Sequence, residues 1–182
     1  MMKKIMVWGV IFFCCSFVAV AVSTSEEAKK ISATAIIMGS DADSPVSGTV
    51  NFIEKEGGVE MIANLSGVTP PGKHGIHIHA GGSCGDSGKA AGGHFNPAKS
   101  ERHGFLVSDG YDNVHAGDLG NIDIDKNGQG VLFLFLPGLS ITDENNSIVG
   151  HAVILKENED DFTQPAGNAG AGIGCGTINL NN

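Results

Sequence analysis

Positive charge is scarce in this sequence. Its 182 residues include 11 lysines and arginines against 20 aspartates and glutamates, the formal net charge is −9, and Arg102 is the only arginine. Proteins that bind nucleic acids or anionic membrane surfaces neutralise phosphates with clustered basic side chains. The acidic composition therefore argues against both kinds of partner.

Cysteine is also sparse, and two of the four cysteines lie in a distinctive N-terminal segment. Lys3 and Lys4 precede an apolar run over residues 5–22, and Ala-Val-Ala at 19–21 offers a small-residue cleavage site. This pattern predicts a signal peptide over residues 1–21, a short extension over 22–30 and one domain over 31–182. An uncleaved membrane anchor is the alternative, because the apolar run approaches the length that spans a bilayer. The charged SEEAKK segment that follows favours cleavage, which would change the net charge from −9 to −11 because two lysines and no acids are removed.

Cleavage would leave Cys84 and Cys175 as the only cysteines. The predicted location is secreted or periplasmic, with no membrane attachment after cleavage, and such compartments are oxidising. We therefore expect one disulfide between the two cysteines, in preference to two buried free thiols. A bridge that closes a loop of this length stabilises a fold by roughly 2 to 4 kcal/mol.

Amphipathic helical periodicity is missing from the mature chain. Segments that alternate or run apolar over strand-like lengths are separated by Gly, Asn and Pro, and they cover residues 31–39, 47–56, 59–65, 75–79, 130–136 and 147–156. The pattern predicts an all-β domain, an antiparallel sandwich or flattened barrel. Residues 80–129 show little strand character, and their content of His, Cys and Asp predicts a functional loop.

Histidine is concentrated where the strand pattern meets that loop. His77 and His79 are separated by one apolar residue, so they share one face of an extended strand. The loop adds three histidines and a carboxylate that together make a natural tetrahedral zinc set: His94, His103, His115 and Asp118. Taken singly, each loop histidine could be an ordinary surface residue, but the combination favours a metal site.

These motifs resemble one family. "HGIHIH", "AAGGHFNP", "HAGDLGNI", "DDF", "QPAGNAG" and "CG" occur in the order and spacing of the copper,zinc superoxide dismutases, particularly the exported bacterial type, over nearly the whole mature chain. The resemblance implies an immunoglobulin-like Greek-key β-sandwich of about eight antiparallel strands with long metal-binding loops. It also implies the family reaction, dismutation of superoxide to dioxygen and hydrogen peroxide, and leaves a homodimer open.

The resemblance also implies a role for individual residues. His77, His79 and His94 match copper ligands; His94 also bridges to zinc, which is completed by His103, His115 and Asp118. Asp160 matches the carboxylate that links a copper histidine to a zinc histidine, Cys84 and Cys175 match the family disulfide, and His74 matches a structural histidine that binds no metal.

The sequence departs from the family at two positions. In "VGHAVILKENEDD", alignment without gaps places Lys156 where a fourth copper histidine is expected. His151 could serve instead only through a bulge, because residues five apart point to opposite faces of a regular strand. In "GNAGAG", Gly172 stands where the family has the arginine that guides the superoxide anion to copper.

These departures leave three functional hypotheses. In the first, the protein is an exported, dismutase-like metalloprotein with an intact zinc site and an incomplete copper site, so that activity is weak or lost. In the second, it is an active dismutase with an altered copper sphere; in the third, it is a non-catalytic copper-binding or buffering protein. Zinc is the expected cofactor in all three, copper is expected to bind weakly, and superoxide is the substrate if the protein turns over. The sequence further predicts that Lys156→His combined with Gly172→Arg would exceed either single variant in copper-dependent turnover.

Overall fold

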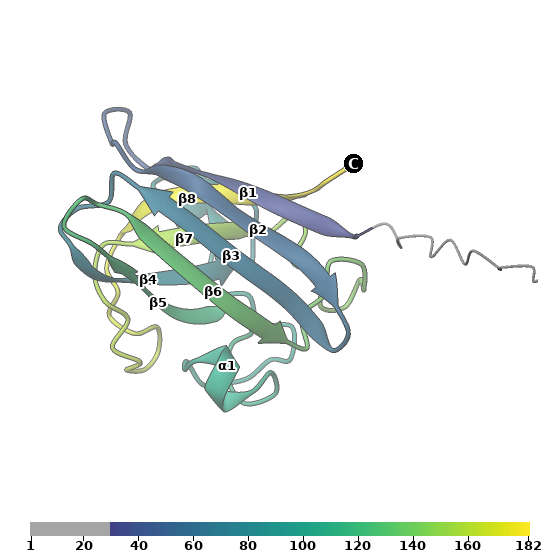
Figure 1. Cartoon of the computed structure of the whole chain (residues 1–182). Helices are drawn as coiled ribbons and strands as arrows, with labels where there is room; N and C mark the ends of the chain where they lie inside the picture. Colours follow the sequence, from purple (N-terminus) through teal and green to yellow (C-terminus); the bar gives the residue numbers. More distant parts are fainter. Residues whose placement is uncertain (1–29) are drawn as a thin grey trace, which may run out of the picture.

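The computed structural model describes residues 30–182, in which eight β-strands account for almost all regular structure (Figure 1). The strands are β1 (Ser32–Gly39), β2 (Ser47–Lys55), β3 (Gly58–Ser66), β4 (Gly72–His79), β5 (Asp118–Ile124), β6 (Gly130–Pro137), β7 (Ala152–Lys156) and β8 (Gly172–Leu180). A 3-10 turn, η1 (Lys89–Ala91), and one short helix, α1 (Leu106–Asp109), interrupt the connection between β4 and β5. The predicted signal peptide and most of the predicted extension lie outside the described residues.

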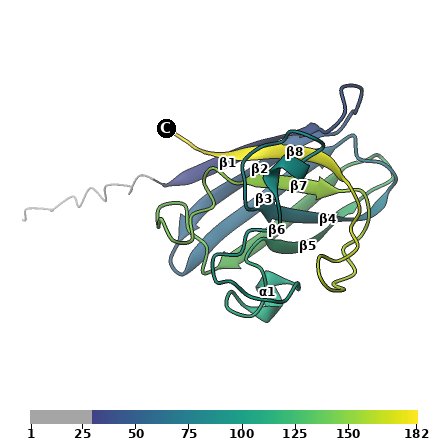
Figure 2. The same cartoon turned by 180° about the vertical axis from the view of Figure 1, so that it is seen from behind.

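All neighbouring strands pair antiparallel, in the order β5-β4-β7-β8-β1-β2-β3-β6. The pairings of β3 with β6 and of β4 with β7 skip strands in the sequence, as Greek-key connections do. The sheet curls so that its two halves face one another, and β5 returns close to β6 (Figures 1 and 2). The predicted all-β sandwich of about eight antiparallel strands is confirmed.

The core lies between the two halves of the sheet and is built by strand alternation. Phe52, Met61 and Leu136 from one half meet Ile76 and Ile78 from the other, all fully buried. Burying one such side chain contributes about 1.5 to 3 kcal/mol relative to exposure, so the inward positions fix the register of each strand. Because Ile76 and Ile78 point into this core, the alternate residues of β4 must point to its outer face.

The sequence pattern did not predict two of the strands, β5 and β8. β5 lies inside the stretch 80–129 that was expected to have little strand character, and its alternation is masked by Gly120 and by the carboxylate of Asp118. β8 contains glycines at alternate positions 172, 174 and 176, which removes the side chains that would have shown a period. β7 begins at Ala152, five residues later than expected.

Two long connections cover the outer face of β4 and β7. The β4–β5 connection lies over β4, β7 and β8, and the β7–β8 connection, yellow-green in Figure 2, lies beside it. Residues 74–79 of β4 are consequently buried on both faces. Within residues 30–182, no helix is long and apolar enough to cross a membrane.

Candidate metal centre

Strand alternation places His77 and His79 on the outer face of β4, beneath the two long connections. Both are buried, although they point away from the apolar core. A short bridge pairs His79 with His94 and brings the β4–β5 connection over the strand. The nitrogen atoms of His77, His79 and His94 lie within 4.8 Å of one another. We call these three residues the copper trio, after the metal that the resemblance assigns to them.

A second group of possible ligands shares His94. Atoms of His94, His103, His115 and Asp118, here called the zinc quartet, also lie within 4.8 Å of one another. The Nδ1 atom of His103 lies 3.0 Å from Asp118 Oδ2, and that of His115 lies 3.2 Å from the same oxygen. Ligand atoms about 2 Å from a tetrahedral zinc are separated by similar distances.

His115 and Asp118 reach this position from one turn, as the sequence predicted. The Asp118 N–H donates to the His115 carbonyl at 3.0 Å, which brings the two side chains to the same side of the turn. His94 Nδ1 lies 2.6 Å from Asp118 Oδ1, so its Nε2 is the nitrogen left to face His77 and His79. The arrangement lets one imidazole face both groups.

Buried nitrogens that point into the two groups support a metal at both. His77 Nδ1 and His79 Nε2 make no hydrogen bond within the described chain, whereas His103 Nδ1 and His115 Nδ1 both face Asp118 Oδ2, as ligands of one ion would. A buried polar atom without a partner costs about 1 to 3 kcal/mol. A cation held by these nitrogens would remove that cost, so the donor atoms fit the metals that the resemblance implies.

Asp160 links the copper trio to the zinc quartet by contacting one histidine of each. Its Oδ2 lies 2.8 Å from His77 Nε2, and its Oδ1 lies 2.9 Å from His103 Nε2. Asn121 fixes the loop that carries it, because the amide accepts from the Asp160 N–H at 2.7 Å and donates to its carbonyl at 2.9 Å. Gly167 is required here: its φ is +74°, and a Cβ would lie 1.8 Å from Asp160 Oδ1.

The electrostatics divide the histidines into two kinds. Burial lowers the pKa of His77 to about 4 and that of His79 to about 3, and it also lowers the pKa of His115. Burial acts the same way on His103, but the facing carboxylates outweigh it and raise its pKa to about 9. Burial acts to raise the pKa values of Asp118 and Asp160, but the facing histidines outweigh it and hold both pKa values below their usual range. In the metal-free protein, a proton therefore stands at His103 where the zinc quartet would take a cation.

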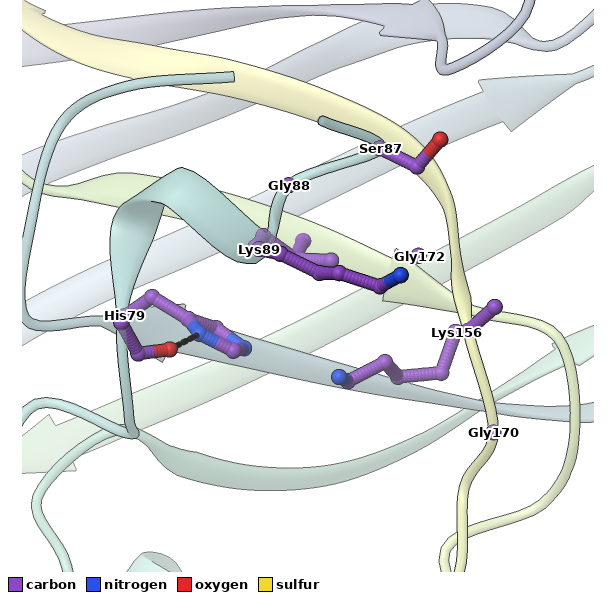
Figure 3. Close-up of a pocket in the computed structure, with 10 residues that line it drawn as sticks. His79, Ser87, Gly88, Lys89, Lys156, Gly170 and Gly172 are labelled. Carbon is purple, nitrogen blue, oxygen red and sulfur yellow. Dashed lines mark hydrogen bonds between the residues drawn. The ribbon is translucent and has the colours of Figure 1, made fainter. Parts of the chain in front are cut away.

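Lys156 lies beside the copper trio. It ends β7 on the same face as Ile154, and it lines one pocket with His79 and a second pocket with His79, His94 and His115. Its side chain extends toward His79 (Figure 3). Burial lowers the pKa of Lys156, and its positive charge contributes to lowering that of His79.

His151 does not take the place that Lys156 occupies. It precedes β7, its ring packs on Phe95 with a centroid separation of 4.2 Å, and its Nδ1 faces the Ala80 carbonyl at 2.7 Å. Within residues 30–182, it belongs to none of the groups that could hold a metal. His74 likewise directs both ring nitrogens to carbonyls, of Lys156 at 2.9 Å and of Pro70 at 2.8 Å.

Backbone and side-chain atoms of Ser87 and Ile154 pack closely around Gly172. A Cβ at this position would lie 2.6 Å from the carbonyl oxygen of Ser87 and 3.0 Å from Ile154. Ser87 belongs to the loop that the Cys84–Cys175 disulfide ties to β8, and that predicted disulfide is present. For Gly172→Arg to supply a guiding cation, the Ser87 backbone would therefore have to move first.

The sequence reasoning also missed a residue. Lys89, two positions after Ser87, lines the same pocket as His79, Lys156 and Gly172 (Figure 3). No local pattern marks Lys89, because the disulfide-tied loop brings it to the pocket.

Comparison with known proteins agrees with this geometry. Residues 46–178 match the family model described as copper/zinc superoxide dismutase (SODC). A "Superoxide dismutase [Cu-Zn]" of Paramecium bursaria Chlorella virus 1 is 36% identical over 82% of this chain and 79% of its own length. An "Extracellular superoxide dismutase [Cu-Zn]" of Haemonchus contortus is 35% identical over 73% of each chain, and a superoxide dismutase [Cu-Zn] of Photobacterium leiognathi is 33% identical over 89% of this chain and 95% of its own.

A solved structure agrees as well. The crystal structure of the clock protein EA4 is 31% identical and superimposes with a TM-score of 0.70 over 81% of this chain and 93% of its own. The chain belongs to the copper/zinc superoxide dismutase family.

Proposed function

We propose that this protein is a zinc-binding member of the family in which copper-dependent dismutation of superoxide is weak or lost. The observation that carries the proposal is the position of Lys156, whose side chain stands beside His79 where a fourth imidazole is expected. A protonated lysine cannot donate a lone pair to a metal, and its charge repels a cation. The copper trio alone would have to hold the metal.

The zinc quartet supports the zinc half of the proposal. His94, His103, His115 and Asp118 supply three imidazoles and one carboxylate, a set that suits tetrahedral zinc. Asp160 holds His103 and His77 in place through its two oxygens, and such partners orient ligands and raise their basicity. Zinc would thus fix the loop that carries three of the four groups.

When bound at the copper trio, copper would supply the one-electron chemistry that superoxide dismutation requires. The chain's own contribution would be to hold His77 and His79 as neutral imidazoles, because burial keeps their pKa values far below neutral pH. His94 would join the two groups, with Nδ1 beside Asp118 and its other nitrogen toward His77 and His79. The missing imidazole would weaken the hold on copper and leave these contributions of the chain intact.

A second candidate, an active dismutase with an altered copper sphere, is favoured by one observation. Burial lowers the pKa of Lys156, and a neutral amine is a metal ligand. Asp160 opposes this shift, because its negative charge stabilises the ammonium form.

Metal content and dismutase activity, measured on one preparation exposed to zinc and copper, separate the candidates. Our proposal expects about one zinc per chain, substoichiometric copper after passage over a chelating resin, and little turnover. Retained copper with fast turnover would contradict it and support the altered copper sphere. Retained copper without turnover would contradict it in favour of a copper buffer.

The protein is further proposed to be exported. The disulfide between Cys84 and Cys175 supports this, because such bonds persist in oxidising compartments, and the Haemonchus contortus relative is named extracellular. N-terminal sequencing of protein recovered outside the cytosol tests both export and cleavage near residue 21. A chain found only in the cytosol with Met1 intact would contradict the proposal.

A further inference from the structure

A pocket beside the copper trio combines two lysines with no acidic residue. It encloses about 240 Å³, and its lining includes His79, Ser87, Lys89, Ile154, Lys156 and Gly172. The whole chain has a formal charge of −9, so a lining with two cationic side chains and no carboxylate departs from the rest of the molecule. The adjoining pocket, which shares Lys156 and includes His94 and His115, has no carboxylate in its lining either.

The two lysines reach the pocket from opposite walls. Lys156 extends from the end of β7 toward His79, while Lys89 extends from η1 with its ammonium group toward Gly172 (Figure 3). Within residues 30–182, neither ammonium group makes an ion pair with a carboxylate. Like charges that face one pocket without a counter-ion repel each other, and a bound anion would remove that repulsion.

The loop that carries Lys89 is fixed in place by packing. Gly88 is buried with a φ of +82°, and a Cβ there would lie 2.8 Å from Ile154 Cδ1. The carbonyl oxygen of Ser87 would lie 2.6 Å from a Cβ added at Gly172, so any side chain at that position would have to displace it. The loop segment that crowds Gly172 therefore also carries Lys89 to the pocket.

We propose that Lys89 and Lys156 form a binding site for a small monoanion next to His79. These two lysines would take the place of the single arginine expected at position 172. The site takes anions of the size and charge of superoxide, chloride or formate. The proposal deepens the proposed function, on which it rests for the assignment of the copper trio, and it names the class of ligand that this centre attracts. A cationic cleft raises the local concentration of an anion about tenfold or more, even on an acidic protein.

Chloride binding to copper-free, zinc-loaded protein tests the site without any turnover. The excess line width of the ³⁵Cl NMR signal reports chloride in exchange with the protein, and added sodium formate tests for competition at the same place. Lys89→Gln and Lys156→Gln each remove one ammonium group. Lys126→Gln is the matched control, because Lys126 follows Ile124, which pairs with Gly72 at the end of β4 opposite His79.

We expect wild type and Lys126→Gln to give the same formate-sensitive broadening. Lys89→Gln and Lys156→Gln should each weaken chloride binding by about tenfold, with zinc content and melting temperature unchanged. Broadening by Lys89→Gln equal to that of Lys126→Gln would overturn the proposal, as would broadening that formate leaves unchanged. If a glutamine variant fails to fold, Lys89→Glu and Lys156→Arg repeat the test, with loss of binding expected for the first and retention for the second. Because copper is absent, a later finding of fast turnover would refute the proposed loss of activity and leave this result standing.

Discussion

Replacing Lys156 by histidine tests the central feature of the site. The change removes a positive charge beside the copper trio and adds the imidazole that the family pattern expects there. Lys156 lies at the same pockets as His79 and His94, so a histidine on the same strand position faces the same space. We expect copper affinity to rise while zinc affinity stays the same.

The size of the effect follows from two contributions. Two unit charges about 4 Å apart repel by about 4 kcal/mol at an effective dielectric constant of 20. Lys156 is partly exposed, and solvent screening reduces this value to about 1 to 2 kcal/mol. A fourth imidazole adds a further ligand of the kind that copper prefers. Together we expect the copper dissociation constant to fall by about 100-fold or more, since each 1.4 kcal/mol is a factor of ten.

Competition with a chelator of known copper affinity measures the change on zinc-loaded protein. Lys156→Met separates the two contributions, because it removes the charge without adding a ligand, and its affinity should lie between those of wild type and Lys156→His. Lys126→His is the control for a new surface histidine with the same change of charge, and it should leave copper affinity unchanged. Wild-type protein that already binds copper as tightly as Lys156→His would refute the reasoning, and Lys156 would then be a competent ligand.

Three further predictions follow from the geometry. Zinc uptake at pH 7.5 should release about one proton, because the facing carboxylates raise the pKa of His103 to about 9 and zinc must displace the proton from this histidine. The proton release should disappear as pH rises through 9. Calorimetry in buffers of different ionisation enthalpy measures the release, and a heat of binding that does not depend on the buffer would contradict the prediction. Gly172→Ala should lower the free energy of unfolding by about 1 to 3 kcal/mol, because the new Cβ would displace the Ser87 carbonyl. Gly85→Ala is the control and should be nearly neutral, because its Cβ would meet no atom nearer than 3.4 Å. Equal melting temperatures for the two variants would contradict the close contact at Gly172. Replacing both Cys84 and Cys175 by alanine should cost about 4 kcal/mol, because the bridge closes a loop between residues 91 apart, and a denaturant midpoint unchanged from that of the oxidised protein would count against this.

The pH dependence of the metal-free protein follows from the same histidines. His103 has its pKa raised above the ordinary value of 6.5, so its contribution to stability is full below pH 6.5 and is lost as pH rises through 9. His77 and His79 have theirs lowered, so their contribution is present above pH 6.5 and is lost as pH falls toward 4 and 3. Metal-free protein should therefore be most stable near neutrality, which thermal melts between pH 4 and 10 can check. A melting temperature that keeps rising from pH 7 to 10 would contradict the assignment of His103.

Sequence alone determined the features that depend on local spacing. The spacing of His77 and His79 was enough to place both on one face of a strand, because alternate side chains of a strand point the same way. The spacing of His115 and Asp118 was enough to predict that one turn brings them together. The odd offset between His151 and Lys156 predicted that they would point in different directions, and the structure places them so.

Tertiary structure decided what depends on contacts between distant segments. β8 could not be recognised from its sequence, because its glycines show no periodicity and only pairing with β1 and β7 defines it. The obstruction of Gly172 by Ser87 joins residues 85 positions apart in the chain, and a local pattern carries no information about such a contact. The same loop brings Lys89 to Lys156. The sequence therefore specified which side chains could bind metals, and the packing of the long connections over β4 and β7 decided which charges stand beside them.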